Sequence, residues 1–100
     1  MPQLTKTQAA VELVRIRGEI SRLEREVSDM AWELTQVQAK KAAAYSIMLG
    51  NFAWDEKVIA QQQHREFVRQ EADLKARHEP RRKELDKLRT KEEYLKIDLL

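Results

Sequence analysis

The two histidines are the first candidates for chemistry, because imidazole titrates near neutral pH and is a common metal ligand. His64 and His78 are separated by fourteen residues, which is about 21 Å along a helix and too far for one metal ion. Neither belongs to an H-x-x-x-H or H-E-x-x-H pattern, and the sequence has no cysteine and no glycine-rich phosphate loop. We therefore expect no catalytic residues, no metal ion and no cofactor, and we predict that the protein is not an enzyme.

Basic residues toward the C-terminus are the second candidates. Residues 75–91 carry eight lysines and arginines against three acidic residues, although the net charge of the whole chain is only +2. Four cations recur every seven positions along one side of a helix, and we call them the basic flank: Lys75, Arg82, Arg89 and Lys96. A basic stripe is one hypothesis for nucleic-acid binding.

The neighbours of the basic flank argue against that hypothesis. Glu79, Asp86 and Glu93 lie three or four positions from its members, where ion pairs form along a helix. No aromatic residues alternate with the cations to stack on bases. We therefore favour a solvated, salt-bridged surface over an acidic protein partner, and both of these over nucleic acid.

The elements that carry these residues are predicted to be helices. Charged residues make up 36% of a chain that has two glycines and two prolines, and its commonest residues have high helix propensity. Core-type residues alternate in steps of four and three from Ala9 to Met48, which is the spacing of a coiled-coil seam. We call this series the seam stripe, and Lys41 is its one charged member: Ala9, Leu13, Ile16, Ile20, Leu23, Val27, Met30, Leu34, Val37, Lys41, Ala44 and Met48.

Local residues mark the ends of the first helix, which we expect over residues 5–48. Thr5 and Gln8 have the spacing of a capping box, and Leu4 is placed to pack on Ala9. Residues 49–51 form the expected turn, in which Gly50 takes the left-handed conformation open to glycine. Asn51 is the expected cap of the second helix, which we expect over residues 52–98.

The second helix has a rougher stripe, with Ala60, Phe67 and Leu74 among its apolar members and Glu71 among its polar ones. If the chain folds back at the turn, Leu34 lies opposite Phe67, while Met30 meets Glu71 and Ile20 meets Arg81. Pro80 removes one helix hydrogen bond, and we favour a kink there over a break. The predicted fold is all-α, an antiparallel helical hairpin or coiled coil of two long helices, in a single domain over residues 1–100.

A second stripe lies on the far side of the first helix from the seam. Its members are small or apolar, with Arg25 as the one charge, whereas a solvated helix face normally carries charged pairs. A hairpin of two helices also buries little apolar area. We therefore favour a protein interface here over an exposed alanine- and serine-rich face, and we call its residues the outer face: Val14, Gly18, Ser21, Arg25, Ser28, Trp32, Thr35, Ala39 and Ala42.

Large apolar residues also gather at the predicted turn. We call four of them the tip: Tyr45, Leu49, Phe52 and Trp54. Together with Ile47 and Met48 they either plug the end of the hairpin, which we favour, or form an exposed docking surface rich in interface anchors.

These observations favour a non-enzymatic protein–protein interaction module that self-assembles or docks onto a larger complex. Helical hairpins of this kind resemble stalk subunits of rotary ATPases, prefoldin-type chaperones and small phage assembly or inhibitor proteins, but in architecture alone. A nucleic-acid-associated protein that uses the basic flank is the alternative. No apolar run approaches the length of a membrane span, and the N-terminus lacks a signal-peptide segment, so we expect a cytoplasmic protein without membrane contact.

Overall fold

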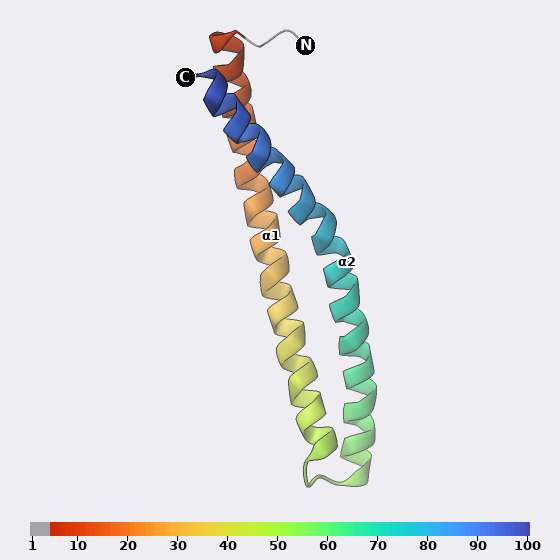
Figure 1. The fold of residues 1–100 in the computed structure, drawn as a ribbon. Helices are drawn as coiled ribbons and strands as arrows, with labels where there is room; N and C mark the ends of the chain where they lie inside the picture. The colour runs from red at the N-terminus through yellow and green to blue at the C-terminus, as the bar shows by residue number, and fades with distance from the viewer. Residues whose placement is uncertain (1–4) are drawn as a thin grey trace. The chain divides into compact units, whose positions relative to one another are not determined.

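Two helices joined by one loop make up the fold in the computed structural model, which describes residues 5–100. Helix α1 spans Lys6–Leu49 and helix α2 spans Trp54–Asp98, and residues 5–100 contain no strand (Figure 1). The predicted all-α helical hairpin is confirmed. Neither helix has a stretch that is long and apolar enough to cross a membrane over these residues.

The start of α1 is held by the predicted capping box. The backbone N–H of Thr5 donates to Gln8 Oε1 over 3.0 Å, and the N–H of Gln8 donates to Thr5 Oγ1 over 3.2 Å. Two backbone donors that have no partner inside the helix are thereby satisfied. The predicted contact of Leu4 with Ala9 lies outside the described residues.

The loop begins and ends later than expected, and the role assigned to Gly50 is wrong. No glycine has a positive φ among residues 5–100, so Gly50 does not take the left-handed conformation. It is needed for space instead, because an added Cβ would lie 2.7 Å from the Phe52 ring and 2.9 Å from the Ser46 carbonyl oxygen. Asn51 does not cap α2 either, because the first helical bond runs from Lys57 N–H to the Ala53 carbonyl over 3.1 Å.

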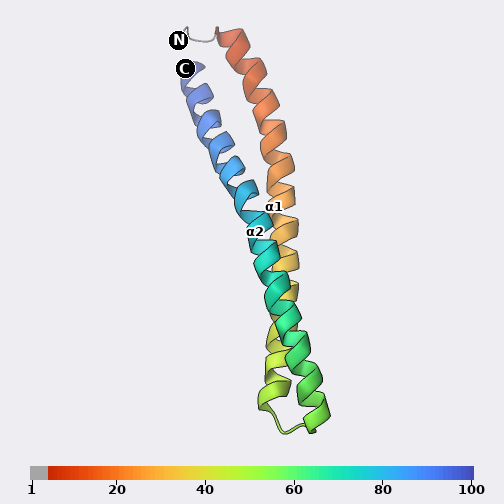
Figure 2. The same ribbon diagram turned by 90° about the vertical axis from the view of Figure 1, so that its right-hand side faces the viewer.

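The helices form two compact units, each of which pairs a segment of α1 with a segment of α2. Unit 1 contains residues up to Ser28 and residues from Glu79 to the C-terminus. Figure 2 shows its two segments side by side, with both chain ends at the same end of the unit. Its core is a cluster of seven buried apolar residues: Ala9, Leu13, Ile16, Ile20, Leu23, Leu85 and Leu95. Four cross-helix ion pairs border this core, joining Glu12 to Lys91, Arg17 to Glu92, Glu24 to Arg89 and Glu26 to Arg81.

Unit 2 contains residues 29–78 and is the hairpin that holds the loop. It has a smaller apolar core, in which the buried residues are Val37, Ala44, Ala60 and Leu74. Polar groups complete its seam. Lys41 Nζ donates to both oxygens of Glu71, over 3.0 and 3.1 Å, and the rings of Tyr45 and His64 lie 5.7 Å apart.

The seam stripe of α1 is buried or half-buried at every member, as the periodicity predicts. The predicted register of the two helices, however, is wrong. Glu71 pairs with Lys41 rather than lying beside Met30, and Arg81 pairs with Glu26 rather than lying beside Ile20. The two differences have the same sign and amount to eleven and six residues, which average a little more than one heptad. The loop accounts for part of this shift, because it takes residues 50–53 before α2 begins at Trp54 and so moves the fold-back point by about one residue.

Helix α2 continues through Pro80 without a break. Proline has no N–H, so the Ala76 carbonyl loses the donor that it would have in an ordinary helix. The boundary between the two units falls beside this residue, between His78 and Glu79.

Candidate protein interface

The outer face is exposed along its full predicted length, and it divides between the two units. Val14, Gly18, Ser21, Arg25 and Ser28 lie in unit 1, and Trp32, Thr35, Ala39 and Ala42 lie in unit 2. Alpha-helical spacing explains this exposure, because side chains half a turn away from the seam point away from α2. Val14 and Trp32 are therefore large apolar groups that the hairpin itself leaves in water.

Trp32 stands at the edge of a groove in unit 2. Its indole is 65% exposed. The other residues of the groove come from both helices: Glu33, Gln36, Val37 and Lys40 of α1, and Gln70, Asp73, Leu74 and Arg77 of α2. A partner that covers the indole would thus meet charged groups of both signs on one side and the uncharged outer-face residues of unit 2 on the other.

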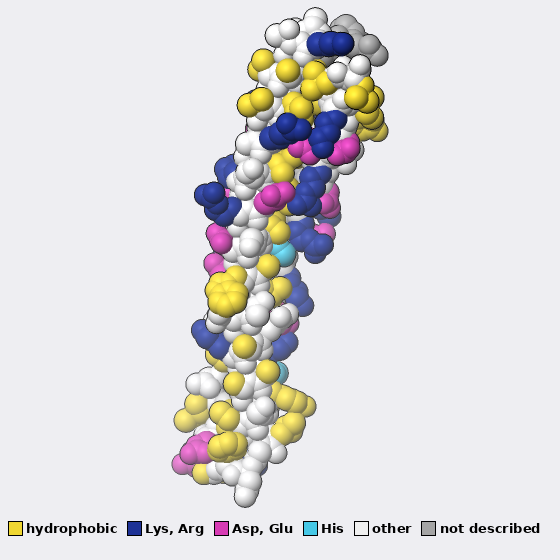
Figure 3. Space-filling view, turned by 90° about the vertical axis from the view of Figure 1, so that its left-hand side faces the viewer, with side chains coloured by type: hydrophobic (Ala, Val, Ile, Leu, Met, Phe, Trp, Pro, Cys, Tyr) yellow, Lys and Arg dark blue, Asp and Glu magenta, His cyan; other side chains and the backbone are white. Residues whose placement is uncertain are grey.

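The four tip residues are exposed, so the favoured interpretation of a buried plug is wrong for them. Leu49 is 69% exposed and Trp54 is 77% exposed, while Tyr45 and Phe52 are each about half exposed. Figure 3 shows hydrophobic side chains gathered at this end of unit 2. Ile47 and Met48, which belong to the same cluster, are half-buried. The physical reason is that two helices cannot enclose the side chains on every side of their own loop.

Sequence reasoning missed two properties of the tip. Ile59 is more than half exposed and borders a shallow depression with Ile47 and Phe52. In addition, residues 42–54 form a run of thirteen residues without a charge, in a chain that is 36% charged. That run is visible in the sequence and marks the exposed apolar segment directly.

Three of the four members of the basic flank pair with carboxylates, whereas Arg82 makes no ion pair among residues 5–100. Lys75 pairs with Glu71 over 3.6 Å, Arg89 pairs with Glu24 over 3.2 Å, and Lys96 pairs with Glu92 and Glu93 over 3.7 and 3.3 Å. Of the three acidic partners expected from the sequence, Glu93 is engaged with the flank. Glu71 and Glu92 lie four positions before their lysines on the same helix, and Glu24 alone reaches the flank from α1.

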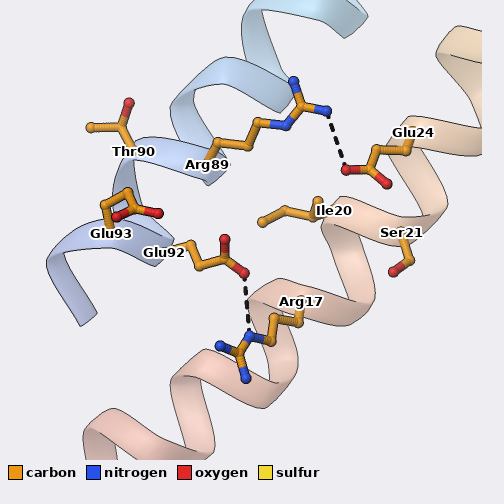
Figure 4. Close-up of a pocket in the computed structure, with 8 residues that line it drawn as sticks. All are labelled: Arg17, Ile20, Ser21, Glu24, Arg89, Thr90, Glu92 and Glu93. Carbon is orange, nitrogen blue, oxygen red and sulfur yellow. Dashed lines mark hydrogen bonds and ion pairs between the residues drawn. The ribbon is translucent and has the colours of Figure 1, made fainter. Parts of the chain in front are cut away.

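A groove of unit 1 shows the same pairing at close range (Figure 4). Its two cations both reach across to the opposite helix, Arg17 toward Glu92 and Arg89 toward Glu24, with Ile20 between the two pairs. Glu93 adds a third carboxylate to the lining. Acidic groups therefore outnumber basic groups in this groove, and it does not present free positive charge to a phosphate.

Ion pairing also shifts the titration of individual groups. The hydrogen bond from Arg15, aided by Lys91, lowers the pKa of Glu12 to about 2. In unit 2, the hydrogen bond from Lys41 lowers the pKa of Glu71 below its usual value. Both shifts come from cations next to carboxylates, as in structural ion pairs. Among residues 5–100, no three His, Cys, Asp or Glu side chains are placed to hold a metal ion.

The fold and this surface define the class of the protein as an all-α helical hairpin with exposed apolar residues on one helix face and at the loop. No protein-family model matches the chain, and no curated protein and no solved structure matches it either.

Proposed function

We propose that the protein is a non-enzymatic protein–protein interaction module that works through its exposed apolar surfaces. The observation that carries the proposal is the tip, where Leu49, Phe52 and Trp54 stand exposed within thirteen residues that carry no charge. Burying one large apolar side chain is worth about 2–3 kcal/mol, and tryptophan is enriched among the residues that dominate binding energy. Either a copy of the chain or a larger assembly provides the covering surface.

The paired state of the basic flank supports this proposal over a nucleic-acid-associated function. A phosphate-binding surface gains affinity by neutralising phosphates with free cations. Arg89 and Lys96 would first have to give up carboxylates at 3.2–3.7 Å. Nucleic-acid binding remains the alternative function, and salt dependence separates the two.

The test is to capture partners on the immobilised full chain from its native host and to identify them by mass spectrometry. We expect Trp54→Ser to lower the recovery of specific partners at least tenfold, because the exposed indole is the anchor. Tyr94→Ser is the matched control, since Tyr94 is also an exposed aromatic but lies in unit 1, away from the tip. Equal recovery by the wild type and both variants would contradict a role for the tip.

The alternative is tested on the same chain by fluorescence anisotropy with labelled single- and double-stranded oligonucleotides. Apolar partner binding should change little between low and high salt, whereas phosphate binding weakens steeply. Tight oligonucleotide binding that is lost with added salt and with Arg82→Gln/Arg89→Gln would replace the proposed function by the alternative.

A further inference from the structure

Six residues of α1 in unit 2 form a pattern that is the same in both directions along the helix. From either end the order is a large apolar residue, a hydroxyl residue, two alanines, a hydroxyl residue and a large apolar residue, with spacings of three, four, three, four and three. All six are exposed: Trp32, Thr35, Ala39, Ala42, Ser46 and Leu49. Trp32 and Leu49 are about two-thirds exposed, so this is an unpartnered apolar face rather than a solvated one.

The charges of this segment lie on the side of the face toward α2, where they approach Trp32. Glu33 and Lys40 line the groove shared with Gln70 and Asp73, and Lys41 is bound to Glu71. The positions that flank the six on either side are uncharged, namely Ala31, Gln36, Gln38, Ala43 and Tyr45. A second copy brought onto this face therefore meets few like charges, the exposed Lys40 beside Ala39 being the nearest, and like charge is the usual obstacle to pairing of identical surfaces.

The two hydroxyl groups on the face are already satisfied within their own helix. Thr35 Oγ1 donates to the Ala31 carbonyl and Ser46 Oγ donates to the Ala42 carbonyl, each over 3.0 Å. Covering them with another helix therefore leaves no buried donor unpaired, which would otherwise oppose the contact. Each hydroxyl residue presents its carbon atoms to whatever packs on the face.

We propose that two copies of this chain pair through this face, with their α1 helices antiparallel. The two-fold axis passes between Ala39 and Ala42, where small side chains allow a close approach. Trp32 of each copy packs on Leu49 of the other. These two contacts, one at each end of the face, lie about 26 Å apart along the helix. The occupant is a second copy because a two-fold interface needs a surface complementary to itself, and this pattern has that property.

This inference rests on the proposed function and names one partner for it. The contact uses one helix face from each copy, so it is smaller than a standard stable interface. We expect a dissociation constant in the micromolar range. Leu49 belongs both to the tip and to the six, whereas the tip residue Trp54 lies outside the six, so Trp54→Ser tests the docking of other partners without changing the dimer face.

Sedimentation equilibrium of the full chain at concentrations up to ~100 µM tests the dimer. We expect Ala39→Glu to weaken it at least tenfold, because it places a carboxylate from each copy near the axis. Ala72→Glu is the matched control, since it makes the same change at an exposed position of α2 in the same unit. A wild-type chain that stays monomeric over this range, or a dimer that Ala39→Glu leaves intact, overturns the inference.

Cysteine cross-linking tests the antiparallel register, because the chain has no cysteine of its own. A Thr35→Cys chain mixed with a Ser46→Cys chain should form a mixed disulfide under mild oxidation. Each variant alone should form far less, because identical positions lie about 16 Å apart in this register. Homotypic disulfides in place of mixed ones indicate a parallel pair and overturn the inference. A monomeric chain that still loses partners through Trp54→Ser leaves the proposed function standing and removes the dimer alone.

Discussion

At the scale of residues, the most informative contact joins the polar interruptions of the two stripes. Lys41 breaks the apolar series of α1, and Glu71 breaks that of α2. They meet across the seam of unit 2 at 3.0 Å, and Lys75 also approaches Glu71 at 3.6 Å. The Glu71 side chain is 14% exposed, so losing its partner leaves a charge that water solvates poorly. The ion pair between Lys41 and Glu71 thus explains why each stripe carries a charged residue at that position.

Because of this contact, we expect the stability of the folded chain to depend on pH, and we expect Glu71→Gln to remove that dependence. The pKa of Glu71 is lower in the folded chain than its ordinary value of 4.5, first because of the hydrogen bond from Lys41. A carboxylate with a lowered pKa contributes stability that is present above the unfolded value and is lost as the pH falls through the folded value. Urea unfolding should therefore show the variant to be less stable than the wild type at pH 7, with the difference closing below pH 4.5.

The matched control for this prediction is Glu66→Gln. The pKa of Glu66 is also lowered, by the hydrogen bond from Arg69, but that pair lies exposed along one helix. Exposed pairs contribute little stability, so we expect a smaller loss at pH 7 than for Glu71→Gln. A difference for Glu71→Gln that is the same at pH 7 and pH 3 contradicts the assignment.

The two glycines should respond to alanine in opposite directions. At Gly18 a Cβ would meet nothing within 4 Å, so Gly18→Ala should stabilise the chain by about 1 kcal/mol through helix propensity. At Gly50 the Cβ would press on the Phe52 ring and the Ser46 carbonyl, so Gly50→Ala should destabilise by about 1–3 kcal/mol. Thermal unfolding of both variants is the measurement. If Gly50→Ala instead stabilises the chain, the prediction is contradicted, because the loop then accommodates the added Cβ without strain.

At the scale of elements, the register of α1 against α2 is the property that most affects the surface. A heptad series packs almost as well after a slide of one heptad, because apolar residues again face apolar residues. The loop and the ion pairs decide between such registers. The observed register turns Arg89 toward Glu24 and Arg17 toward Glu92, and it thereby neutralises Arg89, a member of the basic flank.

The observed register is tested by intramolecular cross-linking in unit 1. Arg17→Cys/Glu92→Cys should link efficiently with a short bis-maleimide in dilute solution, since these side chains meet at 3.2 Å. Arg17→Cys/Glu84→Cys is the control, because it is the pair expected from the sequence alone and lies about 12 Å away along α2. More efficient linkage of the control pair would restore the register expected from the sequence.

At the scale of the whole molecule, the buried apolar side chains are few and unevenly shared. Unit 1 buries seven such residues, six of which are leucine or isoleucine, whereas unit 2 buries four, two of which are alanine. Small buried area gives small stability, since apolar burial must offset chain entropy. Unit 2 is also where Trp32 and the tip are exposed. The part of the molecule with the weakest core is therefore the part that gains most from a partner.

The sequence by itself determined both helices, the cap at Thr5 and the buried stripe from Ala9 to Met48. These features depend on neighbours within one or two helical turns, which the sequence displays directly. It also marked the exposed outer face, since the side opposite a seam follows from the same periodicity.

The tertiary structure alone decided the register, the cross-helix ion pairs and the exposure of the tip. Lys41 and Glu71 are thirty residues apart, and no local rule states that they meet. The prediction that Leu49 and Trp54 are buried at the end of the hairpin was wrong. Burial there depends on how many helices surround a side chain, which a stripe of residues does not reveal. The seven-residue repeat is the physical reason that the sequence does not determine the register. It specifies which face of each helix is buried, but several alignments of the two helices bury that face almost equally well.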